Sequence, residues 1–283
     1  MLIVIEYVYI NCLNSKFKIK GDSAKEYPQI PDVNEDKLYS IPQDVLKSMI
    51  KQTVFATSQD QTKPILMGEL LEIENGNINL VAIDGYRFAV RSCQVDNLIH
   101  EDLKAKIIIP GKTLIDVNSL LSSEEEVKVG FNEKNAIFII NDTKIVTRLL
   151  EGEFIDYKKL CPREYNSKIK LKTRDLLNSI ERASLLSQSE LNNLIKLSIR
   201  DSMMAITSNN EKGNVYEEVS LSLEGDYLDI AFNSRYLLEG LKNIDCEEIY
   251  IEFTTNVNPC IIKPADGTKY TYLLLPVRIS SNN

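Results

Sequence analysis

Few residues of this 283-residue chain have the type and spacing that catalysis needs. His100 is the only histidine, so a two-histidine metal site and a histidine-based catalytic triad are both excluded within one chain. The acidic run Glu124–Glu126 could offer carboxylates to a metal ion, but it lies in a loop before a strand, where solvation is the commoner case. Neither a P-loop nor a nucleophile-elbow motif occurs. We therefore expect no independent catalysis, no cofactor and no metal.

Two other stretches indicate binding. The first, NLVAIDGYRFAVRS at 79–92, reads as an apolar strand, a tight Asp84-Gly85 turn and a second alternating strand. The second, YTYLLLPVRI at 270–279, lies near the end of the chain. Both carry more apolar side chains and arginines than a hairpin and a terminus need. We expect them to form two walls of one peptide-binding groove.

A groove for a short peptide needs a few apolar anchors in a preformed pocket. Phe88 and Leu273–Leu275 could supply the apolar walls, and Arg87 and Arg278 could hold the peptide backbone or an acidic side chain. Taken alone, an apolar run such as Leu273–Leu275 is more often an ordinary core strand. The groove is therefore a hypothesis that needs support from elsewhere in the chain.

Composition limits the class of protein. The net charge of −8 argues against coating DNA or an anionic membrane by bulk charge, but it leaves room for a local basic stripe. The five cysteines are odd in number and lack CxxC spacing, which indicates reduced thiols in a cytoplasmic protein. The N-terminal MLIVIEYVYI has no basic region before it and is too short for a membrane helix, so we expect a strand there.

Periodicity predicts helices and strands in a repeating order. The expected helices are one that begins at Ile41 and has Leu46, Met49, Ile50 and Thr53 on one face, and others over 111–121, 173–186 and 233–244. The expected strands are 3–10, 16–20, 65–74, 79–82, those of KIIIP, EVKVGF, NAIFII and KIVTRLL, a run over 195–230, and 249–253, 260–263 and 270–279. Asn75-Gly76 predicts a hairpin turn between two of these strands.

The order of elements is duplicated. DVLKSMIKQTVFATS, from Asp44, aligns with DLLNSIERASLLSQS, from Asp175, an offset of 131 residues that indicates a duplicated domain rather than a solenoid repeat. Each unit combines two helices with antiparallel strands, which is an α+β architecture. We expect domains at 36–163 and 164–283, preceded at 1–35 by two strands and a linker with Pro28 and Pro31.

Basic residues recur on one side of the expected helices. Arg174, Asn178 and Arg182 share a helix face, and Arg235 and Lys242 lie two turns apart. Lys47 and Lys51 occupy a similar face in the first unit. For any one helix a solvated surface is the ordinary reading, but recurrence in an acidic chain suggests charge placed on one side of the molecule.

At this level the chain resembles the bacterial DNA polymerase III beta subunit, the sliding clamp. The motifs that carry the resemblance are DGYRFAV at 84–90, EGEFIDYKKLCP at 151–162, FNSRYLLEGLKNI at 232–244, YLLLPVRI at 272–279 and TVFATSQDQTKPILMG at 53–68. The resemblance covers nearly the whole chain in order. It implies tandem DNA-clamp domains matching the family's second and third domains, with 1–35 similar only to the last strands of the first.

The resemblance also implies a site for short motifs of polymerases, the clamp loader and repair proteins. The matching groove residues are Leu66, Ile83, Gly85, Tyr86, Arg87, Phe88, Ile155, Lys159, Leu160, Asn233, Tyr236, Val257, Leu273, Leu274, Leu275, Pro276, Val277 and Arg278. The matching DNA-facing residues are Lys47, Lys51, Gln59, Arg174, Arg182, Arg235 and Lys242.

Some positions depart from the family pattern. Ile155 replaces the usual proline, while Ile83 and Tyr86 stand where threonine and histidine are common. These changes make the groove more apolar and should alter partner affinity without abolishing the site. On the DNA side, Pro64 and Ile65 stand where some members have tyrosines, so aromatic DNA contacts are not expected there.

The implied function is that of an accessory, non-catalytic clamp that holds the replicative polymerase alpha subunit, the clamp loader and other clamp-motif proteins on duplex DNA, with no membrane partner. Because the family closes its ring through the first domain, we expect no closed two-chain ring here, and favour a monomer or a weak open dimer. Two alternatives remain: a non-ring fragment acting only as a peptide-binding module or decoy, and a ring of three chains.

Overall fold

The computed structural model describes residues 6–23, 25, 27, 38–95, 104–187, 193–211 and 213–278. His100, Pro28, Pro31 and Ile279 lie outside the described residues. The chain divides into a small unit, residues 1–32, and a large one, residues 33–283. Within the described residues, no helix has the length and apolar character that a membrane crossing requires.

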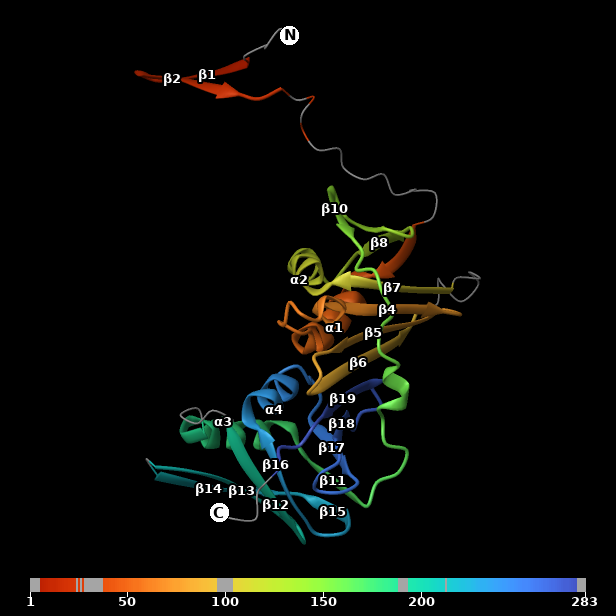
Figure 1. The fold of residues 1–283 in the computed structure, drawn as a ribbon, viewed down its shortest axis with the longest axis vertical. Coiled ribbons are helices and arrows are strands. Elements are labelled where there is room, and N and C mark those ends of the chain that lie inside the picture. The colour runs from red at the N-terminus through yellow and green to blue at the C-terminus, as the bar shows by residue number, and fades with distance from the viewer. Residues whose placement is uncertain are drawn as a thin grey trace. The chain divides into compact units, whose positions relative to one another are not determined.

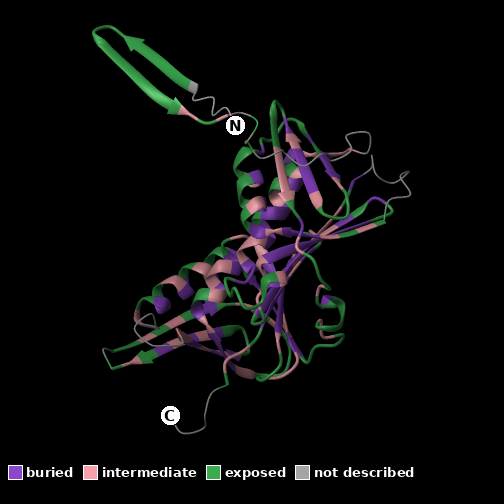
Figure 2. Ribbon diagram, turned by 45° about the horizontal axis from the view of Figure 1, so that its top comes forward, coloured by how far each residue is buried: buried purple, intermediate pink, exposed green. Residues whose placement is uncertain are grey.

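The small unit contains a hairpin of β1 (Glu6–Cys12) and β2 (Ser15–Gly21), which confirms both expected strands within the described residues. Antiparallel register places Val8 opposite Ile19 and Ile10 opposite Phe17, so these four side chains share one face. All four are exposed, and Figure 2 shows the hairpin in the colour of exposed residues. A two-stranded hairpin of this kind has no core of its own.

The first half of the large unit runs from β3 to β10. Its elements are β3 (Tyr39–Pro42), α1 (Gln43–Thr53), η2 (Val54–Ala56), η3 (Pro64–Met67), β4 (Gly68–Glu74), β5 (Asn77–Ile83), β6 (Arg87–Gln94), β7 (Lys104–Pro110), α2 (Gly111–Leu120), β8 (Glu126–Phe131), β9 (Asn135–Ile140) and β10 (Thr143–Arg148). The connection to the second half contains one short 3₁₀ helix, η5 (Tyr157–Lys159).

The second half repeats this order with one additional strand, β15. Its elements are β11 (Ser167–Lys172), α3 (Thr173–Ser187), β12 (Leu194–Arg200), β13 (Met203–Asn210), β14 (Gly213–Ser220), β15 (Ser222–Gly225), β16 (Leu228–Asn233), α4 (Ser234–Leu241), β17 (Glu248–Phe253), β18 (Cys260–Pro264) and β19 (Tyr270–Leu274). The α+β architecture with two helices on antiparallel sheets in each half is therefore as expected.

One nine-stranded sheet joins the halves, in the order β15-β11-β17-β18-β19-β6-β5-β4-β7. The joint is the antiparallel pair of β6 and β19, in which Phe88 lies opposite Leu273 and Arg87 opposite Leu274. Two further sheets, β10-β9-β8-β3 and β14-β13-β12-β16, complete the halves. Figure 1 shows α1, α2, α3 and α4 gathered on one side of the long sheet.

The helices are fixed by apolar packing on that side. In α1, Leu46, Met49 and Ile50 are buried, as the helical spacing predicts, and they pack with strands of the first half. In the second half, Leu176 and Ile180 of α3 are likewise buried, and they belong to a separate core. Each half therefore buries its own helices, and Figure 2 shows buried residues concentrated between helices and strands.

Turn chemistry sets the strand ends. Asn75 and Gly76 both have positive φ, of 50° and 75°, which is the hairpin turn that this dipeptide predicts. The strand expected from Ile65 begins only at Gly68, because Pro64 opens a 3₁₀ turn instead. The strand expected over 270–279 ends at Leu274. Pro276 follows closely and cannot donate to a strand ladder.

Glu69 is an ionisable group in the interior. It is fully buried on β4, and neither carboxylate oxygen has a hydrogen-bond partner within the described structure. Burial, opposed in part by the Thr53 side chain, raises the pKa of Glu69 to about 8. The native protein therefore holds this carboxyl protonated at neutral pH, whereas an unfolded chain releases the proton.

Glu69→Gln should remove a pH dependence of stability. Because the folded pKa is the higher one, the free energy of unfolding of the parent protein should fall as pH rises from about 4.5 to about 8, by on the order of a few kcal/mol. Urea unfolding at several pH values should show a flatter profile for the variant. Parallel profiles for the two proteins would mean that Glu69 ionises freely in the native state.

Candidate functional site

Three neighbouring strands place an apolar floor on the face of the long sheet that lies opposite the helices. Ile83 of β5 pairs with Phe88 of β6, and Phe88 pairs with Leu273 of β19, so the three side chains form one row across the joint. All three are buried and pack with Leu66 and Tyr157. The two stretches that the sequence marks out thus lie side by side.

Several other expected groove residues are apolar and exposed. Tyr86 is 61% exposed and Leu275 is 39% exposed, and a backbone hydrogen bond of 2.9 Å from Leu275 N to Tyr86 O links them. The other exposed members are Ile155, Leu160 and Val257. A buried apolar floor with exposed apolar residues around its strands has the composition of a binding surface.

Two residues that were expected to line the groove, Arg87 and Leu274, lie on the helix side of the long sheet rather than on the apolar floor. Side chains alternate along a strand, so the paired residues Arg87 and Leu274 lie on the helix side when Phe88 and Leu273 lie on the floor side. Leu274 is fully buried in the core of the second half. The expectation that Leu274 forms a wall of the groove is corrected by this alternation.

Arg87 is a buried structural cation. It is 6% exposed, and its guanidinium is 2.9 Å from Asp84 Oδ2 and 2.6 Å from Glu239 Oε2. It also donates to Phe55 O at 2.8 Å. Burial disfavours its charge, but Tyr272, Asp84 and Glu239 raise the pKa of Arg87 above its ordinary value. Arg87 therefore helps to fix the two halves together, and its contact with a bound peptide stays a prediction.

A hollow of about 540 Å³ lies at this joint. It brings together expected groove residues and expected DNA-facing residues, namely Tyr86, Arg87, Tyr236, Gln59 and Arg235. The rings of Tyr86 and Tyr236 stack at its edge, with centroids 5.9 Å apart. The joint therefore carries polar and aromatic lining on the helix side and an apolar floor on the other.

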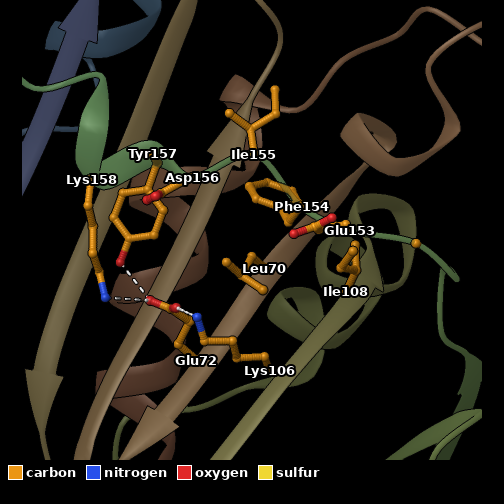
Figure 3. Close-up of a pocket in the computed structure, with 11 residues that line it drawn as sticks. Leu70, Glu72, Lys106, Ile108, Glu153, Phe154, Ile155, Asp156, Tyr157 and Lys158 are labelled. Atoms are coloured by element: carbon orange, nitrogen blue, oxygen red, sulfur yellow. Dashed lines mark hydrogen bonds and ion pairs between the residues drawn. The ribbon is translucent and has the colours of Figure 1, made fainter.

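A second hollow, of about 350 Å³, lies beside the connection between the halves (Figure 3). Tyr157 donates its hydroxyl to Glu72 Oε2 at 2.7 Å, and Lys106 Nζ is 2.9 Å from Glu72 Oε1. Although burial opposes ionisation, these two partners lower the pKa of Glu72. Ile155 lines the hollow, so this polar contact positions the connection that carries it.

The remaining expected groove residues have backbone or surface roles. Asn233 caps α4 by accepting from Arg235 N at 3.0 Å, and Val277 N donates to Ala231 O at 2.8 Å. Gly85 has φ of 98°, which suits a glycine in a tight turn. Lys159 forms an exposed ion pair with Asp156, Arg278 is exposed, and Pro276 is half-buried.

The expected DNA-facing cations are exposed but mostly compensated by carboxylates. Lys51 is 2.8 Å from Asp245, Arg235 is 2.8 Å from Glu239 and Lys242 is 2.8 Å from Glu181. Arg182 binds Glu217, and Lys47 donates to Leu121 O. Arg174 is exposed and has no recorded ion pair to a described residue. The helix side is therefore less positive than its basic residues alone suggest.

Metal and thiol chemistry find little support here. Over the described part of the chain, no group of three or more His, Cys, Asp or Glu side chains could hold a metal ion. The five cysteines are all unpaired, and burial raises the pKa of the Cys260 thiol to about 12. Cys260 is therefore a core residue rather than a nucleophile.

Two family models match the chain. The central domain of the DNA polymerase III beta subunit matches residues 40–156, and the C-terminal domain matches residues 158–278. The beta sliding clamp of Staphylococcus epidermidis is 36% identical over 268 residues, which are 94% of this chain and 70% of the relative. This chain belongs to the DNA polymerase III beta subunit family.

Solved structures agree with this sliding-clamp assignment. The DNA polymerase sliding clamp from Bacillus subtilis has a TM-score of 0.92 and 34% identity, over 97% of this chain and 73% of that one. The Pseudomonas aeruginosa sliding clamp bound to griselimycin has a TM-score of 0.88 and 25% identity, over 96% of this chain and 74% of that one. The chain is thus a member of a family of non-catalytic polymerase subunits.

Sequence reasoning missed several residues that hold this clamp joint together. Asp84 was read only as a turn residue, and Phe55 and Glu239 were not singled out, although all three contact Arg87. The signal that could have found them is the alternation of β6, which sends Arg87 to the helix side. Glu72 and Tyr157 lay within recognised motifs or strands, but their pairing joins positions 85 residues apart.

Arg87→Met should strongly destabilise the clamp fold. Removing the cation leaves the carboxylates of Asp84 and Glu239 without their buried partner, which costs about 3–5 kcal/mol in comparable pairs. Arg200→Ala, which breaks an ion pair 2.8 Å long with half-exposed Asp229, is the matched control and should cost about 1 kcal/mol or less. Urea unfolding measures both, and equal losses would contradict the structural role of Arg87.

Proposed function

We propose that this chain acts as a DNA sliding clamp, a processivity factor that tethers the replicative polymerase and other proteins to DNA through a peptide groove. The observation that carries the proposal is the row of Ile83, Phe88 and Leu273, which three strands hold across the joint of the two halves. The groove would belong to both halves at once, which makes its shape depend on the correct joint.

The groove would bind a short, extended motif by its apolar side chains. Aliphatic or aromatic anchors would pack on the floor, and burying each would contribute about 1.5–3 kcal/mol. Leu275 would close over the anchors from the side, since it is exposed and its backbone is held by a hydrogen bond to that of Tyr86. Arg278, which is exposed after β19, would meet an acidic side chain of the motif.

The partners of this proposal are duplex DNA, the polymerase alpha subunit, the clamp loader and other clamp-motif proteins. Duplex DNA would contact the helix side through its phosphates. The expected DNA-facing cations lie on α1, α3 and α4 or, in the case of Lys242, directly after α4. Phosphate contacts do not read base sequence, which suits a protein that must move along DNA. We propose that the protein acts in the cytoplasm. We also propose that the first clamp domain ends at residue 163 and that the second begins at residue 164.

A second candidate is a peptide-binding module that does not hold DNA. It is favoured by the carboxylates that already neutralise Lys51, Arg235 and Lys242. Under this candidate the groove would still bind polymerase motifs, and the protein would compete with complete clamps for them. The peptide and DNA measurements below separate the two candidates.

Leu275→Asp should weaken peptide binding about tenfold or more, because the carboxylate would stand where an apolar anchor packs, at a cost of about 1.4 kcal/mol or more. The probe is a labelled peptide from the clamp-binding segment of a replicative polymerase, read by fluorescence anisotropy. Ile115→Asp is the matched control, since Ile115 is an exposed apolar residue of α2.

The control should bind the peptide as the parent does. Equal loss in both variants would point to general damage, and equal retention would remove the groove from the proposal. Because Leu275 keeps its backbone bond to Tyr86 in the variant, folding should be unaffected, and circular dichroism checks this.

Replacing Arg174 and Arg182 by alanine should flatten the salt dependence of DNA binding. Each lost phosphate contact should reduce the slope of log K against log salt by about 0.9, with no change in sequence preference. Lys170→Ala is the control, because Lys170 is on β11 of the long sheet rather than on a helix. Unchanged slopes in the double variant would favour the peptide-binding module over the clamp.

A further inference from the structure

The hollow of about 350 Å³ beside the connection between the halves adjoins the apolar floor. Leu70 and Ile108, which line the hollow, belong to the same buried apolar cluster as Phe88 and Leu273 of the floor. Ile155, an expected groove residue that is 42% exposed, also lines the hollow. The floor and the hollow are therefore parts of one continuous surface of the large unit.

Tyr157 links the floor to a charged cluster at one end of the hollow. Its ring meets that of Phe88 edge to face, with centroids 6.4 Å apart, and its hydroxyl donates to Glu72 Oε2 at 2.7 Å. Lys106 Nζ is 2.9 Å and Lys158 Nζ is 3.7 Å from the same carboxylate (Figure 3). One carboxylate faces two ammonium groups, so the cluster carries an excess of positive charge.

The two lysines of this cluster are open to solvent, whereas the carboxylate is covered. The side chains of Lys106 and Lys158 are 73% and 64% exposed, and that of Glu72 is 7% exposed. An ammonium group has three donors, and the 3.7 Å between Lys158 and Glu72 is too long for a hydrogen bond. A molecule that enters the hollow would therefore meet ammonium donors rather than the carboxylate.

The nearby carboxylates have lysines of their own. Asp156, which lines the hollow, is 2.9 Å from Lys159. Glu74 lines a neighbouring hollow of about 290 Å³, which the two lysines of the cluster also line, and it is 3.0 Å from Lys104. Figure 3 shows Glu153 at the other end of the first hollow, beside Phe154. The hollow thus has apolar walls and one basic end.

We propose that this hollow binds an acidic segment of the partner protein, which flanks the motif that occupies the groove. An apolar side chain of that segment would pack against Phe154 and Ile155, and its carboxylates would meet Lys106 and Lys158. Acidic side chains suit this place because the cluster has donors to spare and positive charge in excess. The inference rests on the proposed peptide groove and names a feature of the partners that use it.

Strand register gives the length of the flanking segment. Phe88 lies opposite Ile83 of β5, and Val81, two residues earlier on β5, lies opposite Leu70 of β4. Glu72 is therefore two strands across and four residues along from Phe88, a separation of roughly 16 Å in a sheet. An extended segment covers this distance in about five residues, so the acidic residues should follow or precede the anchors by about that number.

The test compares capped, labelled peptides on the full chain by fluorescence anisotropy. The core probe is the polymerase-derived clamp-binding peptide, acetylated and amidated so that its ends carry no charge. Extended probes add a spacer of about four residues and then Leu-Glu-Glu, at one end or the other. Matched probes carry Leu-Gln-Gln instead. At one of the two ends, the glutamate probe should bind about fivefold more tightly than its glutamine match, and added salt should reduce this advantage.

Replacing Lys106 and Lys158 together by glutamine should abolish the advantage of the glutamate probe. Glutamine keeps a hydrogen-bond donor for Glu72, and the core probe should bind this double variant as it binds the parent. Lys170→Gln is the matched control, because Lys170 is 2.6 Å from Glu248 on the second-half side of the long sheet. This control should keep the full preference for glutamate.

The outcomes separate this inference from the proposed function. A core probe that binds the parent, with no glutamate advantage at either end, would overturn the acidic-segment site and leave the groove in place. So would an advantage that survives in the double variant, or one that Lys170→Gln reduces equally. A core probe that fails to bind the folded parent would instead remove the groove itself.

Discussion

The antiparallel pair of β6 and β19 is the contact on which the rest of the clamp depends. It continues one sheet through both halves and places different chemistry on its two faces. On one face, Phe88 and Leu273 complete an apolar floor. On the other, Arg87 binds Asp84 from its own half and Glu239 from the opposite half. A buried cation with partners on both sides needs one geometry to offset its desolvation cost, so it favours this one arrangement of the joint.

The architecture could be predicted because the chain repeats itself. Helical spacing placed α1 and α3, the Asn75-Gly76 dipeptide placed a hairpin, and the aligned helices gave the duplication. The orientation of side chains at the joint could not be predicted so well. Whether Arg87 or Phe88 faces the floor depends on which strand pairs with β6, and that partner is distant in sequence. Leu274 was assigned to the wrong face for the same reason.

Charge on the helix side shows a second limit of sequence reasoning. The positions of the basic residues were visible in helical spacing, but their acidic partners were not. Lys51 meets Asp245 across 194 residues, and Arg182 meets Glu217 of β14 across 35. Only the fold brings these groups together. Exposed pairs of this kind contribute little to stability, so their main consequence is a weaker local field for an approaching polyanion.

The long span of the joint also affects the order in which the protein can assemble during synthesis. Leu273 enters the chain 185 residues after Phe88, and β19 is the last described strand. The first half can bury its own helices earlier, but β6 must wait with an unpaired edge that carries Phe88 and Val90. Contacts of such high sequence separation are slow to form, and an open apolar edge is prone to aggregate meanwhile. The nascent chain therefore passes through a stage in which this edge of β6 has no partner strand.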